Sequence, residues 1–232
     1  MDRLGDGMDP ARDIPTSVAP LPSPRLVGWP LGSIVILCAG IELVLVAADQ
    51  GWLGSSTWRR WAYANGGFWS GLLRDWQPNY RGQPAAMFLT YSVLHAGLGH
   101  LAGNIAALCV LGRHVGRAVG PWRFLGLYLF SALGGAVAYA LLSTSPSPMV
   151  GASGAIFGLA GAAIELQRAE AMGWRRAAVG FLGLLLVNAL SWGLAGGQLA
   201  WQAHLGGAIA GAAAMAAFQR RPRHLTREKT RS

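Results

Sequence analysis

A serine and a histidine, Ser153 and His204, are the residues of this chain whose types and surroundings most directly suggest chemistry. Ser153 opens the apolar stretch "SGAIFGLAGAAIELQ", with Gly151 two residues before it and Gly154 directly after it. A serine hydroxyl within reach of an imidazole can act as a nucleophile, because the imidazole takes the hydroxyl proton. The pair therefore predicts nucleophilic hydrolysis, provided that the fold brings these distant positions together.

Hydrolysis of an amide also needs hydrogen-bond donors for the oxyanion of the transition state. His100 and Asn104 are four residues apart, so they share one helix face and can supply side-chain donors. The backbone N–H of Ser153, near the N-terminal end of its helix, can supply another. His95 is five residues before His100, which places it off that face or in the turn "HAGLGH". No acidic residue lies near these positions, so we predict a Ser-His dyad and not a triad.

Two other kinds of function use the same polar residues. A zinc site would recruit His95, His100 and His204, but the sequence lacks H-E-x-x-H and the five-residue spacing suits joint ligation poorly. We therefore predict no metal. A six-helix transporter or channel would use the polar groups as a pathway, joined by Glu42 and Asn188. Transporters often contain internal repeats, and no clear repeat relates the two halves of this sequence. For Glu42, a satisfied or snorkelling carboxylate is the simpler interpretation.

The composition places these residues in a membrane protein. The chain has 232 residues, of which 53% are hydrophobic and 12% charged, with a mean hydropathy of +0.36. Soluble domains carry about 25% charged residues. The formal net charge of +9 does not indicate nucleic-acid binding, because six of the 19 Lys and Arg follow Gln219 and most others lie in short loops. That distribution is typical of membrane orientation signals.

Six apolar segments each have a length near the ~20 residues that a helix needs to cross a bilayer. Such segments are expected to be helices, because a helix satisfies its own backbone hydrogen bonds in lipid. They lie at about 30–48, 93–112, 122–142, 150–166, 177–194 and 201–218. The prediction is an all-α membrane protein with a six-helix membrane domain at 29–219. Residues 1–28 are expected to form a disordered cytoplasmic tail, and residues 220–232 a basic cytoplasmic tail.

The charges of the short loops also predict the orientation of the helices. Arginines follow the second and fourth segments, whereas the loops "STSPSPM" and "SWGLAGGQLA" carry no charge, which places both termini in the cytoplasm. The second, fourth and sixth helices then all begin at the outer face, so their polar residues share one depth and one water-accessible cavity. The loop at about 49–90 is rich in Trp and Arg, and we expect it to lie partly within the outer interface.

Glycine spacing predicts which helices come close enough to join the two halves of the dyad. Gly154 and Gly158 form one small-x-x-x-small pair, and Gly207 and Gly211 form another. Such pairs let helix backbones approach closely in lipid. Each pair begins just after a polar residue, so the contact would bring Ser153 and His204 towards hydrogen-bond distance.

Taken together, these motifs resemble those of the rhomboid intramembrane serine proteases over residues 86–218. Three patterns occur in order on the expected helices: H-x4-H-x3-N at His95, His100 and Asn104, G-x-S-G at Gly151, Ser153 and Gly154, followed by Gly158, and H-x2-G-x3-G at His204, Gly207 and Gly211. The stretch "GPWRFLGLYLFSALGG" looks like the third helix of the family.

The resemblance implies a six-transmembrane-helix rhomboid bundle and a role for each residue. Ser153 would be the nucleophile and His204 the general base. His100, Asn104 and the Ser153 N–H would form the oxyanion hole, and His95 would hold the loop before the second helix. Phe157 occupies a position where the family often has tyrosine, and it can still pack against the His204 ring.

The sequence departs from the family pattern in two places. Ala86 and Met87 stand where the family often has Trp-Arg, and Gly116 stands where it often has a glutamate. Both differences concern loop structure and leave the dyad intact. They argue against a standard conformation of the first loop.

We therefore predict a multi-pass serine endopeptidase of the bacterial inner membrane. It would cleave membrane-protein substrates in or near a transmembrane segment, close to the outer face, with substrate arriving from lipid past the fifth helix. No cofactor and no nucleic-acid partner are implied. The alternatives are a transporter or channel, or a non-proteolytic rhomboid-like binding protein. Within the family, a general rhomboid and the specialised rhombosortase branch both stay open.

Overall fold

The computed structural model describes residues 28–169, 173–194 and 199–220 of the chain. Residues 1–27 and 221–232, where the two cytoplasmic tails are predicted, lie outside these ranges. Six long helices dominate the described part: α1 (Gly28–Asp49), α4 (Leu98–Val119), α5 (Pro121–Leu142), α6 (Ser153–Gln167), α7 (Gly173–Leu194) and α8 (Trp201–Arg220). Shorter helical elements lie between α1 and α4: α2 (Trp58–Gly66), η1 (Ser70–Leu73), α3 (Gln83–Thr90) and η2 (Tyr91–Val93).

Each long helix overlaps one of the six predicted apolar segments, and the largest differences are at the two ends of α4, which also extends past residue 112 to Val119. Helix α4 begins at Leu98 and not near residue 93, because Gly97 adopts a φ of +97° and directs the chain into the helix from a loop. Glycine populates this region without the steric cost that a Cβ imposes. His95 consequently lies in the loop before α4, whereas His100 lies in its first turn.

Two of the described helices, α1 and α5, are long and apolar enough on their own to cross a membrane. The pair Gln83–Val93 and Leu98–Val119, bent by 81°, would add a third span if it were counted as one. Helix α6 has only 15 residues, and α8 is rich in Ala and Gly. Such residues are less hydrophobic than Leu or Ile, but they suit helices that face other helices and not lipid.

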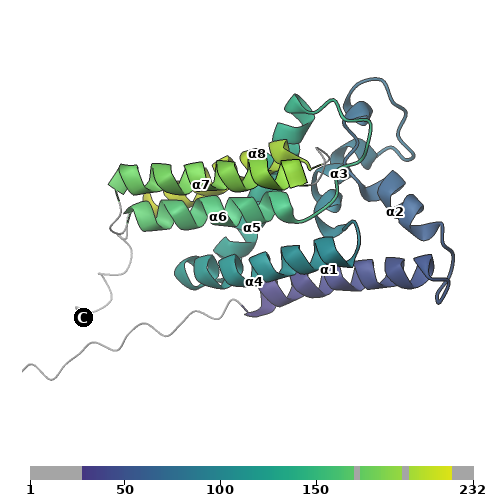
Figure 1. Cartoon of the computed structure of the whole chain (residues 1–232), viewed down its shortest axis with the longest axis horizontal. Coiled ribbons are helices and arrows are strands. Elements are labelled where there is room, and N and C mark those ends of the chain that lie inside the picture. The colour runs from purple at the N-terminus through teal and green to yellow at the C-terminus, as the bar shows by residue number, and fades with distance from the viewer. Residues whose placement is uncertain (1–27, 170–172, 195–198, 221–232) are drawn as a thin grey trace, which may run out of the picture.

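The outer surface of the bundle is apolar, as a membrane protein requires. Leu141 is 76% exposed, Ile36 73% and Val110 71%, and they come from three different helices. The interior is closed by Phe124, Leu127 and other residues of α1, α4, α5, α6 and α8. Together with the long helices, this outward apolar surface makes the fold an all-α membrane bundle. Figure 1 shows α1, α4, α6 and α7 running along a similar direction, with α2 and α3 gathered at one end.

Helices α6 and α8 approach each other through glycines, and α5 joins them in the same way. A Cβ on Gly207 would overlap the carbonyl oxygen of Gly154, and a Cβ on Gly211 would overlap that of Gly158. Gly134 of α5 packs against Ala210 of α8 so closely that a Cβ there would overlap the alanine side chain. The backbones of the three helices therefore touch, which is the packing that small residues allow in lipid.

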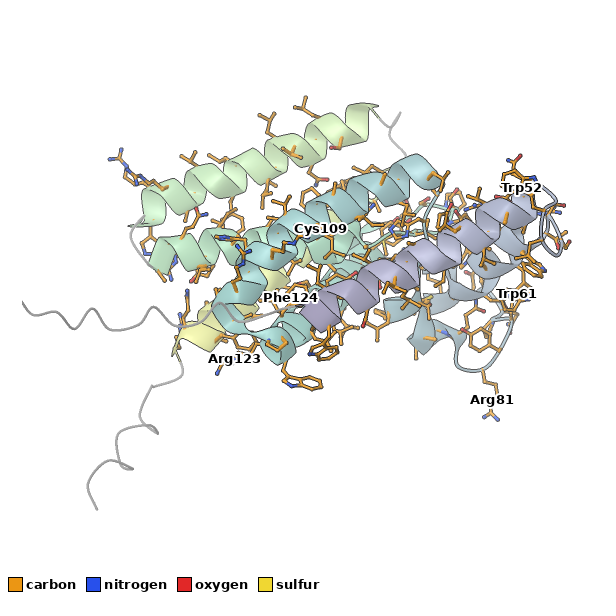
Figure 2. All side chains as sticks on the ribbon, turned by 90° about the horizontal axis from the view of Figure 1, so that it is seen from below. Trp52, Trp61, Arg81, Cys109, Arg123 and Phe124 are labelled. Atoms are coloured by element: carbon orange, nitrogen blue, oxygen red, sulfur yellow. The ribbon has the colours of Figure 1, made fainter. Side chains whose placement is uncertain are left out.

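The first loop, defined here as residues 50–97, gathers at one end of this bundle. Figure 2 shows Trp52, Trp61 and Arg81 at that end, and Arg123 at the other. The loop is anchored by Phe68, which is fully buried and forms an isolated bridge with Met149. The bridge holds the short segment that leads into α6, so the fold ties the first loop to the start of the helix that carries Ser153.

Candidate active site

The side chains of Ser153 and His204 are hydrogen-bonded to each other across the α6–α8 contact. The Ser153 Oγ lies 2.7 Å from the His204 Nε2. Ser153 is the first residue of α6, and His204 lies in the first turn of α8. His204 is only 3% exposed, whereas Ser153 is half-buried. The glycines described above let the two helix starts come this close, because a larger residue at Gly207 would overlap the backbone of Gly154.

A third side chain, Asn188 of α7, contacts the other nitrogen of the imidazole. Its Oδ1 lies 2.9 Å from the His204 Nδ1. The Asn188 Nδ2 donates to the backbone oxygen of Trp201 at 3.1 Å, which leaves Oδ1 to face the histidine as an acceptor. The His204 Nδ1 therefore carries the hydrogen, and Nε2 has a lone pair for the hydroxyl hydrogen of Ser153. This is the tautomer that a general base needs.

Sequence reasoning considered Asn188 only as part of a transport pathway and not as a partner of His204. The sequence nevertheless contained a signal for this partner, because a side-chain amide in an apolar helix usually bonds to a specific polar group. Asn188 also lies near the end of α7, and antiparallel helices bring the end of one beside the start of the next. The same depth argument that grouped Ser153 with His204 applies to this residue.

The His204 ring is also fixed by an aromatic neighbour. The Phe157 ring is stacked on it with centroids 4.2 Å apart and planes 5° from parallel. Phe157 follows Ser153 by one turn of α6, so the nucleophile and the stacking ring stand on the same helix face. The imidazole is thus held on its two nitrogens by Ser153 and Asn188, and on its face by Phe157.

His100 lies beside the segment that precedes Ser153. Gly151 has a φ of +128°, and a Cβ on it would come within 2.8 Å of the His100 Cε1 and 3.0 Å of Nε2. Glycine is therefore required at this position both by its conformation and by the histidine. The same hypothetical Cβ would lie 3.8 Å from the Ser153 Oγ, so the His100 ring and the serine border one space.

The remaining predicted residues surround this space. Asn104 is 8% exposed, and its Nδ2 donates to the backbone oxygen of His100 at 2.8 Å, which leaves its second amide hydrogen for another acceptor. The backbone N–H of Ser153 belongs to the first turn of α6, where no intrahelical acceptor is available. His95 is fully buried, and its ring lies edge-on to that of His100 with centroids 5.3 Å apart.

The polar residues considered for other functions have different surroundings. The carboxylate of Glu42 is buried and pairs with Arg59, whose Nη2 lies 2.9 Å from the Glu42 Oε1. Asn188 is instead hydrogen-bonded to His204. Within the described ranges, no group of three or more His, Cys, Asp or Glu side chains is arranged to hold a metal ion.

Comparison with known proteins agrees with this architecture. The Rhomboid domain family matches residues 82–221, which is more than half of the chain. Rhomboid protease GluP of Bacillus subtilis (strain 168) is 38% identical over 131 residues, covering 56% of this chain and 25% of that protein. RHOMBOID-like protein 6, mitochondrial, of Arabidopsis thaliana is 32% identical over 140 residues, covering 59% of this chain and 45% of that protein.

The chain thus spans less than half the length of these curated relatives. The matched region nevertheless contains α4 to α8 and every site residue described above. The protein therefore belongs to the rhomboid family.

Proposed function

We propose that this chain is an intramembrane serine endopeptidase in which Ser153 is the nucleophile and His204 the general base. The observation that carries the proposal is the 2.7 Å contact between the Ser153 Oγ and the His204 Nε2, at the start of two touching helices. The similarity to a relative named as a rhomboid protease supports the same activity.

The chemistry follows from the hydrogen-bond pattern. The Ser153 Oγ attacks the carbonyl carbon of a substrate peptide bond while its proton passes to the His204 Nε2. The resulting imidazolium returns this proton to the leaving amine as the C–N bond breaks, which leaves an ester on Ser153. A water molecule, deprotonated by the same Nε2, then attacks the ester carbon. Nε2 returns the proton to the Ser153 Oγ as the ester C–O bond breaks and the acid is released. Asn188 accepts the Nδ1–H throughout and keeps the ring in the productive orientation.

The oxyanion of each tetrahedral intermediate would be bound by His100, Asn104 and the backbone N–H of Ser153. The amide of Asn104 has one hydrogen beyond its bond to the His100 carbonyl. Loss of one such donor typically slows an enzyme by about 10²- to 10³-fold. His95 supports the ring of His100 by contact, and no cofactor enters any of these steps.

We propose that the substrates are membrane proteins, which are cut in or near a transmembrane segment. We also propose that they reach the site from the lipid, past α7. Two observations support this route. A cavity of about 310 Å³ lies between α7 and the start of α8, lined by Leu185, Asn188, Ala189 and Trp201. The outward face of α7 is apolar, with Leu182 63% exposed. An apolar substrate helix can slide along such a face without leaving the lipid.

The proposed orientation places the site near the outer face of a bacterial inner membrane. The first loop and the site occupy the same end of the bundle, whereas Arg123 lies at the opposite end (Figure 2). Arginine in short loops is typical of the cytoplasmic side. Interfacial Trp and Arg in the first loop suit the outer headgroup layer.

Covalent labelling tests the nucleophile. The purified wild type should react with a fluorescent fluorophosphonate, and Ser153→Ala should not. Ser131→Ala, which removes a fully buried hydroxyl of α5, serves as the control and should label as the wild type does. Equal labelling of wild type and Ser153→Ala, or no labelling of a folded wild type, would refute the assignment. A transporter or a non-proteolytic binding protein would retain its function in Ser153→Ala.

The substrate can be sought with the same pair of proteins. Membrane and secreted proteins are compared between cells that carry the wild type and cells that carry Ser153→Ala. If the chain is a general rhomboid, the cells with the wild type should contain cleaved forms of membrane proteins that have internal cleavage sites. If it is a rhombosortase, the cleaved proteins should instead be secreted proteins that have a C-terminal sorting tail.

A further inference from the structure

The peptide group that joins His95 to Ala96 is bonded on both sides. Its carbonyl oxygen accepts two hydrogen bonds from α2, one from the Tyr63 hydroxyl at 2.6 Å and one from the Arg59 Nη1 at 3.1 Å. Its N–H donates to the Nδ1 of His100 at 3.3 Å. A single peptide plane therefore connects α2 to the side chain of His100, the proposed oxyanion donor.

On the α2 side of this connection, the side chain of Arg59 is fixed by two carboxylates, one of which is buried. Arg59 lies 2.9 Å from the carboxylate of Glu42, which is fully buried in α1, and its Nε also bonds to Asp49 at 2.5 Å. Burial lowers the pKa of Arg59, but the bonds to Glu42, Asp49 and Tyr63 outweigh this effect and raise the pKa above its ordinary value. Burial raises the pKa of Tyr63, so its hydroxyl keeps its proton. Both side chains thus remain donors at neutral pH.

The His100 side of the connection fixes a tautomer. Because Nδ1 accepts from the Ala96 N–H, the hydrogen of the neutral ring must be on Nε2. Nε2 and the neighbouring Cε1 are the ring atoms that lie against Gly151, in the space that borders Ser153. A cation bonded to the carbonyl oxygen of a peptide group also polarises its N–H, which strengthens the bond that the N–H makes.

We propose that Arg59 and Tyr63 are positioning residues that act through the 95–96 peptide group to hold His100 as an Nε2–H donor towards the oxyanion. This inference rests on the proposed function, because it assigns the purpose of His100. It gives α2 an indirect part in catalysis, through the main-chain atoms of residues 95 and 96.

Tyr63→Phe is the test variant, since it removes one hydroxyl and keeps the ring. The matched control is Tyr80→Phe, because the hydroxyl of Tyr80 also donates to a carbonyl in the first loop, that of Asn65 at 3.1 Å. Saturation kinetics of fluorophosphonate labelling give a maximal rate and an apparent affinity. Tyr63→Phe should lower the maximal rate by about 3- to 10-fold, the effect of one lost hydrogen bond, with the affinity unchanged. Tyr80→Phe should alter neither.

Repeating the pair in His100→Ala tests whether the effect passes through the histidine. In that background Tyr63→Phe should slow labelling less than twofold further. An equal loss in both backgrounds, no loss in either, or a loss that follows a fall in melting temperature would overturn the inference. A wild type that fails to label would refute the proposed function instead, as would equal labelling of Ser153→Ala.

A spectroscopic readout decides the tautomer without relying on the rate of a slow variant. Long-range ¹H–¹⁵N correlation spectra of histidine-labelled protein in detergent distinguish Nε2–H from Nδ1–H rings, and His100→Ala assigns the signal. His100 should be an Nε2–H ring in the wild type and in Tyr80→Phe, and should gain Nδ1–H character in Tyr63→Phe. An unchanged tautomer in Tyr63→Phe would contradict the proposal.

Discussion

The ring of Phe157 lies parallel to the imidazole of His204, with 4.2 Å between their centroids. Phe157→Leu should therefore lower the maximal cleavage or labelling rate by about 10-fold, because the imidazole gains freedom to leave its productive orientation. Phe157→Tyr keeps the stacked ring and should stay within about twofold of the wild type, on the same geometric ground. Saturation labelling kinetics of the three proteins check this. If Leu and Tyr variants label alike, stacking does not position the base.

Asn188→Leu should slow the reaction much more than it weakens folding. Without an acceptor for the Nδ1–H, the His204 ring adopts either tautomer, and an orienting partner of this kind is worth on the order of 10²-fold or more in rate. Asn188→Asp restores an acceptor and should recover part of the rate, at a cost in stability because it buries a carboxylate. Labelling rates and melting temperatures of both variants separate the two effects. A Leu variant with the wild-type rate would exclude Asn188 from the mechanism.

Gly207→Ala should destabilise the bundle, since its Cβ would overlap the carbonyl oxygen of Gly154. Overpacking of this kind costs about 1–3 kcal/mol, and here it also pushes His204 away from Ser153. Gly126→Ala is the matched control, because a Cβ there would meet nothing within 4 Å. Thermal unfolding in detergent should show a lower midpoint for Gly207→Ala, and a midpoint equal to or above that of the wild type for Gly126→Ala. Equal midpoints for the two variants would mean that the α6–α8 contact can relax.

Glu42→Gln should lower stability, because it leaves the guanidinium of Arg59 without its buried counter-charge. Breaking one side of a buried pair typically costs about 3–5 kcal/mol, and the 19% exposure of Arg59 reduces that figure here. Asp75→Asn is the control, because it removes an exposed carboxylate from the first loop, and it should have little effect on stability. Chemical unfolding of the two variants against the wild type measures the difference. An unchanged stability of Glu42→Gln would show that Asp49 is a sufficient counter-charge for Arg59.

The six long helices and the residues around Ser153 could be predicted because their signals are local. Apolar length marks a helix, and glycine pairs beside a polar residue mark a close contact. The first loop was harder, since α2 has only nine residues and buries none of their side chains, so no long apolar run marks it in the sequence. The hydrogen bonds of Arg59 and Tyr63 to the carbonyl oxygen of His95 could not be predicted, because they join side chains to a main-chain atom and leave no motif. The late start of α4 depends on the conformation of Gly97, which spacing alone does not reveal.

The partner of His204 is a neutral amide and not a carboxylate. In the resting state, Ser153, the neutral imidazole and Asn188 therefore carry no formal charge. A charge within the membrane field would feel about 2.3 kcal/mol per 100 mV, whereas an uncharged group feels no such force. These three resting groups thus offer no net charge on which the membrane potential can act, and in the proposed reaction separated charge arises only while a peptide bond is being broken.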